Sequence, residues 1–482
     1  MSLLLPKFGN SRLQRFLPLL IFLLIAATVA AVVYVTVIST PSVSPCKNVI
    51  LVVLDTVRAD RLGCYGNPSG ITPEIDKFAK ESVLFENAFS QAPWTLPSVA
   101  SLFTSSYPAQ HGAGGFLGRF KMLGEDAVTL AEVFQRCGAS TCAIINVFFL
   151  SEKFGMTQGF GTVDSYVPLS NVDTRRAGPT TDAALRWIDQ HKSKPFFLLV
   201  HYFDPHLVYD PPQPFRRRFA APEDCDTTDY IFGTRRDIIE FRRNKTKLGS
   251  DKIARLEKLH NGEVAYVDSE VGELIEGISK RGLDKNTVIV ITSDHGEEFL
   301  DHGGFEHGHT LYDELLHVPL LIRSCTINPE KENSEGTRRG SVRIQTTVRL
   351  IDIAPTVCEL AGIAAEPAFT GRSLVPLMDG KQEADRSVLS EGNMWGPSGT
   401  GWRKDGLKLI IQSSSPKVQL FDVRSDPKEQ ENLANRHPKR CNDMMSDLKL
   451  ILQTLSQKHL KARPPSLTPD EIERLRSLGY VK

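Results

Sequence analysis

Apolar and polar residues alternate in blocks along this chain, and the blocks predict an α/β fold. Four short runs are almost wholly aliphatic or aromatic, as in "NVILVVLD", and such runs are typical of strands buried on both faces. They span residues 48–55, 194–204, 286–294 and 318–324. Helical spacing of apolar residues falls between them, at residues 73–85, 127–137, 180–191 and 252–281. This alternation predicts a doubly wound, mostly parallel sheet.

The two ends of the chain have a different pattern. Residues 17–38 are almost wholly apolar and would form a helix of about 33 Å, which suits a hydrocarbon core of about 30 Å. Lys7, Arg12 and Arg15 precede them, so we expect a transmembrane anchor with residues 1–16 in the cytoplasm. A cleaved signal peptide is the alternative, because residues 26–31 are small enough for a cleavage site.

A stalk at 39–47 would lead to a large domain at 48–375 and a smaller C-terminal subdomain at 376–482. In the smaller part, "GWRKDGLKLII" and "KVQLFDV" predict two strands of an exposed antiparallel sheet. An amphipathic helix follows, and Thr468 is placed to cap a short charged helix near the end of the chain. If the anchor prediction holds, all of this lies in an extracytoplasmic space, which is periplasmic, extracellular or lumenal.

Charge and cysteine content narrow the choice of partners. Lysine plus arginine and aspartate plus glutamate both number 57, so no global field favours a nucleic acid. The eight cysteines match no zinc-binding spacing; a Cys137–Cys142 disulfide and isolated buried thiols are the two alternatives. Asn244 begins a sequon that accepts a glycan only in a host with that machinery.

Three of the predicted strands end in an acidic residue: Asp55, Asp204 and Asp294. The carboxyl ends of parallel strands meet at one edge of a sheet, where ligands collect, although such residues also serve as helix caps. Asp294 is followed by His295 in a segment that holds five of the twelve histidines. Carboxylates with an imidazole suit a divalent cation, so Asp55, Asp294 and His295 are predicted ligands.

The segment "TLPSVASLFT" places the hydroxyl of Thr95 two residues before Pro97, which suits the first turn of a helix. A helix N-terminus carries free N–H groups and partial positive charge, and therefore binds tetrahedral anions. A hydroxyl there, in contact with a bound cation, would lose its proton and attack sulfur or phosphorus. A simple N-cap threonine is the alternative.

The chain resembles the sulfatase family of the alkaline-phosphatase superfamily over residues 48–481. Four stretches carry the resemblance: "NVILVVLDTVRADRLGCYG", "TLPSVASLFTS", "SDHGEEFLDHGG" and "FDVRSDPKEQENLA". The resemblance implies one divalent metal at Asp55, Asp294 and His295, with Thr95 as the nucleophile beside it. By family this metal is Ca²⁺, with Zn²⁺ and Mn²⁺ as alternatives. The resemblance also implies that His206, in "HYFDPHLVYDPP", assists the leaving group, together with either His307 or His309.

Three departures from the sulfatase pattern change the expected chemistry. Thr95 stands where sulfatases carry the cysteine or serine that becomes formylglycine, so no formylglycine is expected. Val99 replaces an arginine of that signature, and Thr56 replaces the second acid of an Asp-Asp pair. Superfamily relatives with an unmodified threonine are phosphodiesterases, phosphomutases or phosphoethanolamine-type transferases. Some relatives hold a second metal, for which Asp204, His206 and His309 are the candidates here.

These observations lead to one main hypothesis and two alternatives. The main hypothesis is a membrane-anchored hydrolase that cleaves a sulfate or phosphate ester, with a glycan or lipid substrate. The first alternative is a phosphodiesterase or a transferase that moves a phosphoryl headgroup to a lipid or glycan. The second is a catalytically silent protein that binds anionic glycans. Four further residues are interpreted as structural: Arg58 and Asp60 as an ion pair, and His201 and His317 as packed histidines.

Overall fold

The computed structural model describes most of the chain after residue 45. The described residues are 46–166, 175–220, 222, 225, 249–325, 342–364, 366–415, 417–458, 460–477 and 480–481, and they belong to one compact unit. The predicted cytoplasmic segment, anchor and most of the stalk lie outside these residues, as does the Asn244 sequon. Among the residues described, no helix has both the length and the apolar composition that a membrane span requires.

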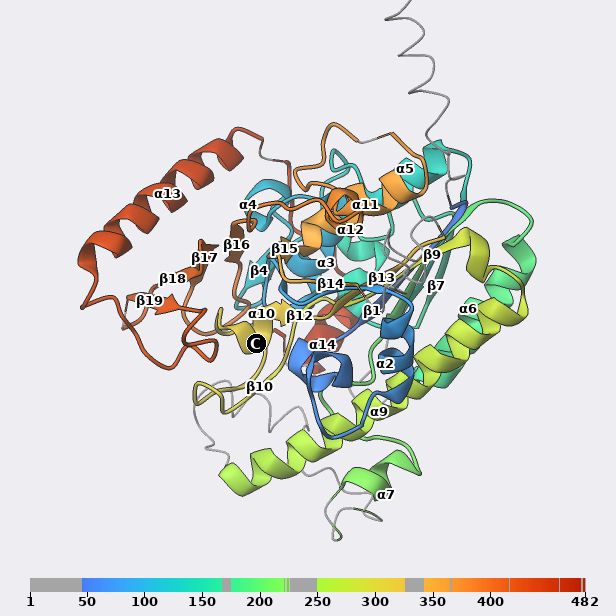
Figure 1. The fold of residues 1–482 in the computed structure, drawn as a ribbon, viewed down its shortest axis with the longest axis horizontal. Coiled ribbons are helices and arrows are strands. Elements are labelled where there is room, and N and C mark those ends of the chain that lie inside the picture. Colours follow the sequence, from blue (N-terminus) through green and yellow to red (C-terminus); the bar gives the residue numbers. More distant parts are fainter. Residues whose placement is uncertain are drawn as a thin grey trace, which may run out of the picture. The chain divides into compact units, whose positions relative to one another are not determined.

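An eight-stranded sheet forms the centre of the molecule, in the order β14-β2-β13-β9-β1-β8-β6-β7 (Figure 1). The strands are β1 (Asn48–Leu54), β2 (Val83–Phe85), β6 (Ser140–Ile145), β7 (Thr162–Ser165), β8 (Phe196–Tyr202), β9 (Thr287–Ser293), β13 (Leu320–Arg323) and β14 (Val342–Ile344). β1 pairs in parallel with both β8 and β9, whereas β13 is antiparallel to its neighbours. The mostly parallel sheet predicted from the sequence is therefore confirmed.

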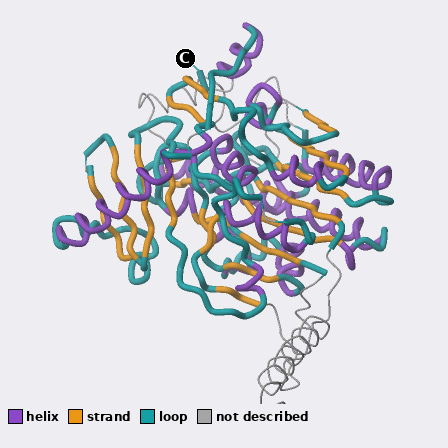
Figure 2. Tube along the Cα trace, turned by 90° about the horizontal axis from the view of Figure 1, so that it is seen from above, coloured by secondary structure: helices purple, strands orange, loops and turns teal. Residues whose placement is uncertain are grey.

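β1 is buried on both faces because its alternate side chains enter two different cores. Val49, Leu51 and Val53 face the core that contains α3 (Thr95–Thr104), α5 (Leu130–Arg136) and α11 (Ile353–Leu360). The residues between them face the core that contains α2 (Pro73–Lys80), α6 (Ala177–His191) and α9 (Ser250–Lys280). A strand with a core on each side needs apolar residues at every position, which explains the continuous run in the sequence. Figure 2 shows helices packed around the strands.

The predicted helices exist, with boundaries that shift by a few residues. The predicted helix at 127–137 begins at Leu130, because Thr129 caps it and forms a capping box with Glu132. The predicted helix at 73–85 ends at Lys80, and its last residues form β2. Shorter helices are α4 (Pro108–His111), α7 (Phe215–Phe219), α10 (Asp313–Leu316) and α12 (Val375–Met378). Short strands pair as β4 (Gly114–Phe116) with β5 (Arg119–Lys121), β10 (Glu298–Phe299) with β11 (Phe305–Glu306), and β3 (Ala88–Phe89) with β12 (His317–Val318) and β15 (Val348–Arg349).

The C-terminal part has a four-stranded antiparallel sheet, β16 (Val388–Glu391), β17 (Gly399–Lys404), β18 (Leu407–Gln412) and β19 (Val418–Asp422). The prediction of one strand over "GWRKDGLKLII" is wrong, because this segment is the hairpin of β17 and β18. Asp405 and Gly406 form its turn with φ of 53° and 81°, as two-residue hairpins of the Asp-Gly kind require. α13 (Pro438–Ser456) and α14 (Pro469–Ser477) follow, and Thr468 forms a capping box with Glu471 at the start of α14, as predicted.

One disulfide bond joins Cys46, two residues before β1, to Cys325, two residues after β13. Of the two alternatives for Cys137 and Cys142, the disulfide is wrong: both thiols are free, with Cys142 buried in β6 and Cys137 exposed. The observed pair was not readable from spacing, since 279 residues separate its members. β13 runs antiparallel to β9, which is parallel to β1. The last residues of β13 therefore lie at the same end of the sheet as the first residues of β1.

Removal of this disulfide is expected to destabilise the fold. A Cys46→Ser/Cys325→Ser variant should lose about 2–4 kcal/mol of unfolding free energy, because the bond closes a long loop in the unfolded chain. Denaturant titration of the purified protein without reductant measures this loss. Cys137→Ser, which removes an exposed free thiol, should leave the midpoint unchanged. Equal midpoints for all three proteins would contradict the prediction.

Candidate active site

The candidate site lies where β1 and β9 end side by side. Leu54 is in register with Ser293, so the residues that follow them, Asp55 and Asp294, become neighbours. Both side chains are fully buried. Among the described residues, neither oxygen of Asp55 and not Oδ2 of Asp294 has a hydrogen-bond partner. Oδ1 of Asp294 accepts from the backbone N–H of His295 at 2.9 Å. Buried carboxylate oxygens without hydrogen bonds are costly unless a positive charge neutralises them.

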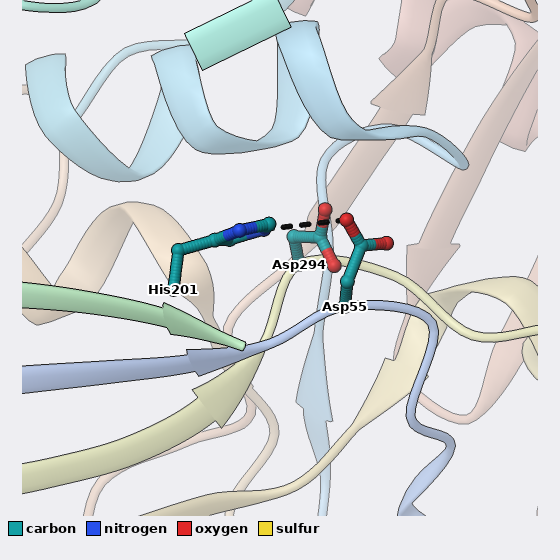
Figure 3. Close-up of side chains that lie close together, drawn as sticks. All are labelled: Asp55, His201 and Asp294. Carbon is teal, nitrogen blue, oxygen red and sulfur yellow. Dashed lines mark ion pairs between the residues drawn. The ribbon is translucent and has the colours of Figure 1, made fainter. Parts of the chain in front are cut away.

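His201 of β8 completes this group from the other side of β1. Its Nε2 lies 3.2 Å from Oδ2 of Asp55, and the imidazole is fully buried (Figure 3). One ligand atom from each of His201, Asp55 and Asp294 falls within 4.8 Å of the others, which is a spacing that a single metal ion can bridge. The interpretation of His201 as a packed strand histidine misses this position.

His295 presents one nitrogen to the same carboxylates. Its Nδ1 lies 3.0 Å from the carbonyl oxygen of Gly296 and therefore donates to it, which leaves the lone pair on Nε2. Nε2 lies 3.3 Å from Oδ2 of Asp294 and 3.6 Å from Oδ1 of Asp55. A backbone carbonyl that fixes one imidazole nitrogen while the other faces carboxylates is the usual arrangement of a metal-binding histidine.

Thr95 is the first residue of α3, and its hydroxyl points into the site. Trp94 occupies the N-cap position, and no side chain caps this helix. Oγ1 of Thr95 instead lies 3.3 Å from Nε2 of His295. The hydroxyl of Ser98, one turn further, donates to the carbonyl oxygen of Asp294 at 2.6 Å and so ties α3 to the end of β9. The alternative role of Thr95 as an N-cap therefore does not fit its geometry.

The electrostatics of the pair of carboxylates fit a bound cation. Burial raises the pKa of Asp294 to about 6, and the charge of Asp55 adds to the increase. Burial also opposes ionisation of Asp55, but the nearby imidazoles of His201, His206 and His295 outweigh it and lower the pKa of Asp55. The unpartnered oxygens and this mutual repulsion fit a divalent cation with oxygen and imidazole ligands.

Two residues near the strand ends do not join the site. Asp204 follows β8 by two residues, and its Oδ1 accepts from the backbone N–H of Ala177 at the start of α6. It acts at a helix N-terminus, and it is not part of the group at Asp55. Thr56 has a φ of 59°, and its hydroxyl donates to the carbonyl oxygen of Pro205 at 2.8 Å. Its side chain therefore bonds to backbone beside the site.

Two further histidines, His307 and His206, extend the group from His295. The ring of His307 lies 4.5 Å from that of His295, and its Nδ1 is 2.9 Å from Oε1 of Glu297. The ring of His206 lies 4.9 Å from that of His307. Nδ1 of His206 donates to the carbonyl oxygen of Leu207, and burial lowers the pKa of His206. Of the two histidines that the sequence left in competition, His307 therefore reaches this group.

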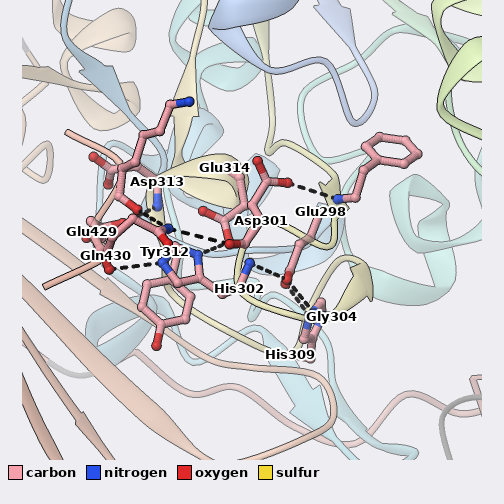
Figure 4. A network of polar contacts seen from close by, with 12 residues as sticks. Glu298, Asp301, His302, Gly304, His309, Tyr312, Asp313, Glu314, Glu429 and Gln430 are labelled. Atoms are coloured by element: carbon pink, nitrogen blue, oxygen red, sulfur yellow. Dashed lines mark hydrogen bonds and ion pairs between the residues drawn. The ribbon is translucent and has the colours of Figure 1, made fainter. Parts of the chain in front are cut away.

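His309 belongs instead to a polar network that braces the site (Figure 4). Its Nε2 lies 2.8 Å from Oε2 of Glu298, whose Oε1 accepts from the backbone N–H of His302. The ring of His302 contacts Oε1 of Glu314 through Nδ1 and the carbonyl oxygen of Glu429 through Nε2. Because Glu429 follows β19, the network joins the loops after β9 to the C-terminal sheet.

The other residues considered in the sequence, Arg58, Val99 and His317, contact parts of the fold outside the candidate site. Arg58 forms ion pairs with Asp60 at 2.6 Å and Asp301 at 2.9 Å, and this confirms the predicted bracing pair. Val99 is fully buried in the core beside α3. His317 contacts the carbonyl oxygen of Glu86. None of these contacts reaches the oxygens of Asp55 or Asp294.

The comparison with known protein families and sequences identifies similar proteins. The family model described as Sulfatase matches residues 47–363, and that described as N-sulphoglucosamine sulphohydrolase, C-terminal, matches residues 300–458. An arylsulfatase of Clostridium perfringens is 25% identical over 457 residues, which cover 80% of this chain and 90% of the relative. Arylsulfatase K of Xenopus laevis is 24% identical, over 85% of this chain and 83% of the relative.

Solved structures share the fold. A protein in complex with its substrate D-glucosamine-2-N,6-O-disulfate aligns with a TM-score of 0.67 at 20% identity, over 86% of this chain and 98% of that one. The phosphonate monoester hydrolase of Agrobacterium radiobacter also aligns with a TM-score of 0.67 at 20% identity, over 88% and 98%. At sequence identities this low, the alignments show that the fold is shared and nothing further.

Proposed function

The chain belongs to the sulfatase family of the alkaline-phosphatase superfamily, whose members hydrolyse ester bonds, and we propose that it cleaves a sulfate or phosphate ester with Thr95 as its nucleophile. One observation carries the proposal. The Thr95 hydroxyl, at the N-terminus of α3, meets Nε2 of His295 beside two buried carboxylates, three of whose four oxygens lack a hydrogen-bond partner among the described residues.

The proposed reaction starts with the anion bound at the N-terminus of α3, where backbone N–H groups and the helix dipole favour negative charge. Oγ1 of Thr95 forms a bond to sulfur or phosphorus as the bond to the leaving oxygen breaks, and the Thr95 proton passes to solvent. His206, when protonated, gives its proton to the leaving oxygen, with His307 beside it. Water then attacks the group held on Thr95, His206 accepts the proton of that water, and Thr95 regains a proton from solvent.

The residues present fit one divalent cation. Asp55, Asp294 and His295 would hold it, together with His201 and the Thr95 oxygen. When bound, such an ion lowers the pKa of the Thr95 hydroxyl and offsets the negative charge of the substrate. Two imidazole nitrogens beside two carboxylates suit Zn²⁺ or Mn²⁺ better than Ca²⁺, which prefers oxygen ligands throughout. The proposal thus keeps one metal but moves away from the Ca²⁺ that the resemblance implies.

The chemistry of Thr95 also bears on which of the two ester classes is cleaved, and it brings in a second candidate function, cleavage of a phosphodiester or phosphonate. A threonine sulfate lacks the elimination route that frees a sulfated formylglycine, whereas a phosphothreonine can be released by water or by a second alcohol. Thr95 therefore favours a phosphate ester, phosphodiester or phosphonate over a sulfate, in spite of the family. The named relatives include sulfatases, and the similar structures include a phosphonate monoester hydrolase, so both classes belong in the substrate panel. Sulfated glycans are the natural class to include among the sulfates.

The proposed location is outside the cytoplasm, with the segment at 17–38 as a single-pass anchor. The Cys46–Cys325 disulfide supports it, because disulfides persist in oxidising compartments and are rare in the cytosol. A lipid or glycan substrate at a membrane surface would be consistent with this location. Nucleic acid is not a proposed partner.

Metal removal is expected to abolish activity. The purified protein is assayed on 4-nitrophenyl sulfate, phosphate, methyl phosphodiester and phenylphosphonate, before and after dialysis against a chelator. We expect turnover of at least one ester, its loss after dialysis, and its return with Zn²⁺ or Mn²⁺ but not with Ca²⁺, because the proposed ligands include two imidazoles. Turnover that survives complete removal of metal would refute the proposed mechanism.

A further inference from the structure

The last residues of the chain return to the candidate active site. The hydroxyl of Tyr480 lies 3.3 Å from Nε2 of His206, a contact between residues 274 positions apart. Tyr480 is mostly buried, with 9% of its surface exposed. Nothing in the local sequence of Tyr480 marks it as part of a catalytic site.

His206 has defined contacts on three sides. Its Nδ1 donates to the carbonyl oxygen of Leu207 at 2.7 Å, and its ring stacks on Phe203 with centroids 4.5 Å apart. Because the proton resides on Nδ1, Nε2 accepts, and the Tyr480 hydroxyl is its donor. When His206 takes up a second proton, the same hydroxyl can turn and accept from Nε2–H, since a phenol is both donor and acceptor. Tyr480 thus contacts the one imidazole atom that exchanges protons in the proposed reaction.

The segment that carries Tyr480 is fixed along its course. The backbone N–H of Leu460 donates to the carbonyl oxygen of Gln110, and a backbone bridge joins Met122 to Arg463. Within α14, Glu471 pairs with Lys153 at 3.3 Å and Leu475 is fully buried. These contacts attach the described part of residues 460–481, which we call the C-terminal strap, to the domain that carries Thr95.

Aromatic packing links the end of the strap to the nucleophile helix. The Tyr480 ring meets Phe149 edge-on at 4.8 Å, and Phe149 meets Trp94 edge-on at 5.3 Å. Trp94 is the N-cap of α3, directly before Thr95. Gly118, in the turn between β4 and β5, approaches so closely that a Cβ there would lie 3.4 Å from the Tyr480 carbonyl oxygen. The ring is therefore packed in place, and its hydroxyl has a defined direction.

We propose that Tyr480 is a positioning residue of the active site: the C-terminal strap holds its hydroxyl beside Nε2 of His206 and so fixes the orientation of this imidazole. The Nε2–H of the protonated ring is then shared in a three-centre hydrogen bond between the Tyr480 oxygen and the leaving oxygen, and passes to the leaving oxygen as its bond breaks. This inference rests on the proposed function, in which His206 protonates that oxygen. It adds the requirement that the far end of the chain must be docked for efficient proton transfer.

The dependence on the leaving group separates this role from a purely structural one. Phenolate is a poor leaving group that needs a proton, whereas 4-nitrophenolate leaves with little help. In the ester class that the wild type hydrolyses, Tyr480→Phe should lower kcat for the phenyl ester roughly 10-fold, because a lost hydrogen bond of about 1.4 kcal/mol corresponds to that factor. The 4-nitrophenyl ester should change less than about 2-fold, and KM should stay within about 2-fold for both.

The matched control is Tyr266→Phe. Its hydroxyl accepts from the backbone N–H of Gly178 at the start of α6, and it has no contact with His206 among the described hydrogen bonds. This variant should leave the ratio of the two rates unchanged. A Tyr480→Phe protein that slows both esters equally, or neither, would overturn the inference while leaving the proposed function intact.

A second measurement does not depend on turnover. Nitrogen NMR of the histidines should show His206 in the Nδ1–H form, with an Nε2 resonance that moves in Tyr480→Phe and stays in Tyr266→Phe. If the wild type cleaves no ester of the panel, the proposed function fails and this spectrum alone decides whether the contact exists. An Nε2–H form of His206, or a resonance indifferent to Tyr480→Phe, would overturn the contact itself.

Discussion

Thr95→Ala is expected to lower kcat by roughly 10³- to 10⁵-fold, on the scale seen when an enzyme loses its nucleophile. The substitution removes the oxygen that faces Nε2 of His295. It leaves α3 intact, because the Thr95 hydroxyl is not a helix cap. Thr95→Ser keeps the oxygen and should retain measurable activity. The comparison therefore isolates the hydroxyl from the fold.

Intact-mass analysis of the peptide that contains Thr95 gives the direct test. After brief incubation with substrate and an acid quench, wild type should carry a phosphate or sulfate adduct and Thr95→Ala none. The adduct also identifies the class of ester. Ser98→Ala, which removes a neighbouring hydroxyl bonded to the Asp294 carbonyl, should still form the adduct. Wild-type turnover in Thr95→Ala would exclude Thr95 as the nucleophile.

Asp294→Asn is expected to move metal affinity and stability in opposite directions. Loss of a carboxylate ligand should weaken metal binding by at least about 100-fold and reduce activity to background. The metal-free protein, however, should gain roughly 1–3 kcal/mol of unfolding free energy at pH 7.5. Burial raises the pKa of Asp294 to about 6 in the folded state from 3.8, so its ionisation opposes folding at neutral pH.

The pH dependence of this gain follows from the same shift. A carboxyl with a raised folded pKa favours folding most below pH 4, and that contribution is lost as the pH rises through 6. The stability difference between metal-free wild type and Asp294→Asn should therefore shrink as the pH falls from 7.5 to 4. Urea titrations at several pH values, with metal content by mass spectrometry, measure both effects. A metal-free Asp294→Asn protein that is less stable than wild type at pH 7.5 would contradict the argument.

Local sequence was enough to predict the framework of the site. Continuous apolar runs identify β1, β8 and β9, and parallel strands bring the residues after β1 and β9 together. Asp55 and Asp294 could be placed on this basis alone. Asp204 could not be separated from them, because its position depends on how the chain leaves β8 and on the N-terminus of α6.

Residues inside strands and at great sequence distance were harder to place. The interpretation of His201 as a packed histidine overlooks that it is the one readily ionised side chain in the buried run of β8, and a buried polar group is the signal that could have found it. Choosing between His307 and His309 required the position of Glu298, which holds His309 in the bracing network. The Tyr480–His206 contact and the Cys46–Cys325 bond join distant segments, and no local pattern encodes them.

The position of the disulfide also determines how the domain would bear mechanical load. Tension applied to the chain before Cys46 reaches the S–S bond at the foot of β1 before it reaches any ladder hydrogen bond of that strand. The bond passes the force to the end of β13, two places along the sheet. Tension on the chain before Cys46 therefore does not pull β1 directly out of the sheet, and Asp55, which follows the other end of β1, keeps its place.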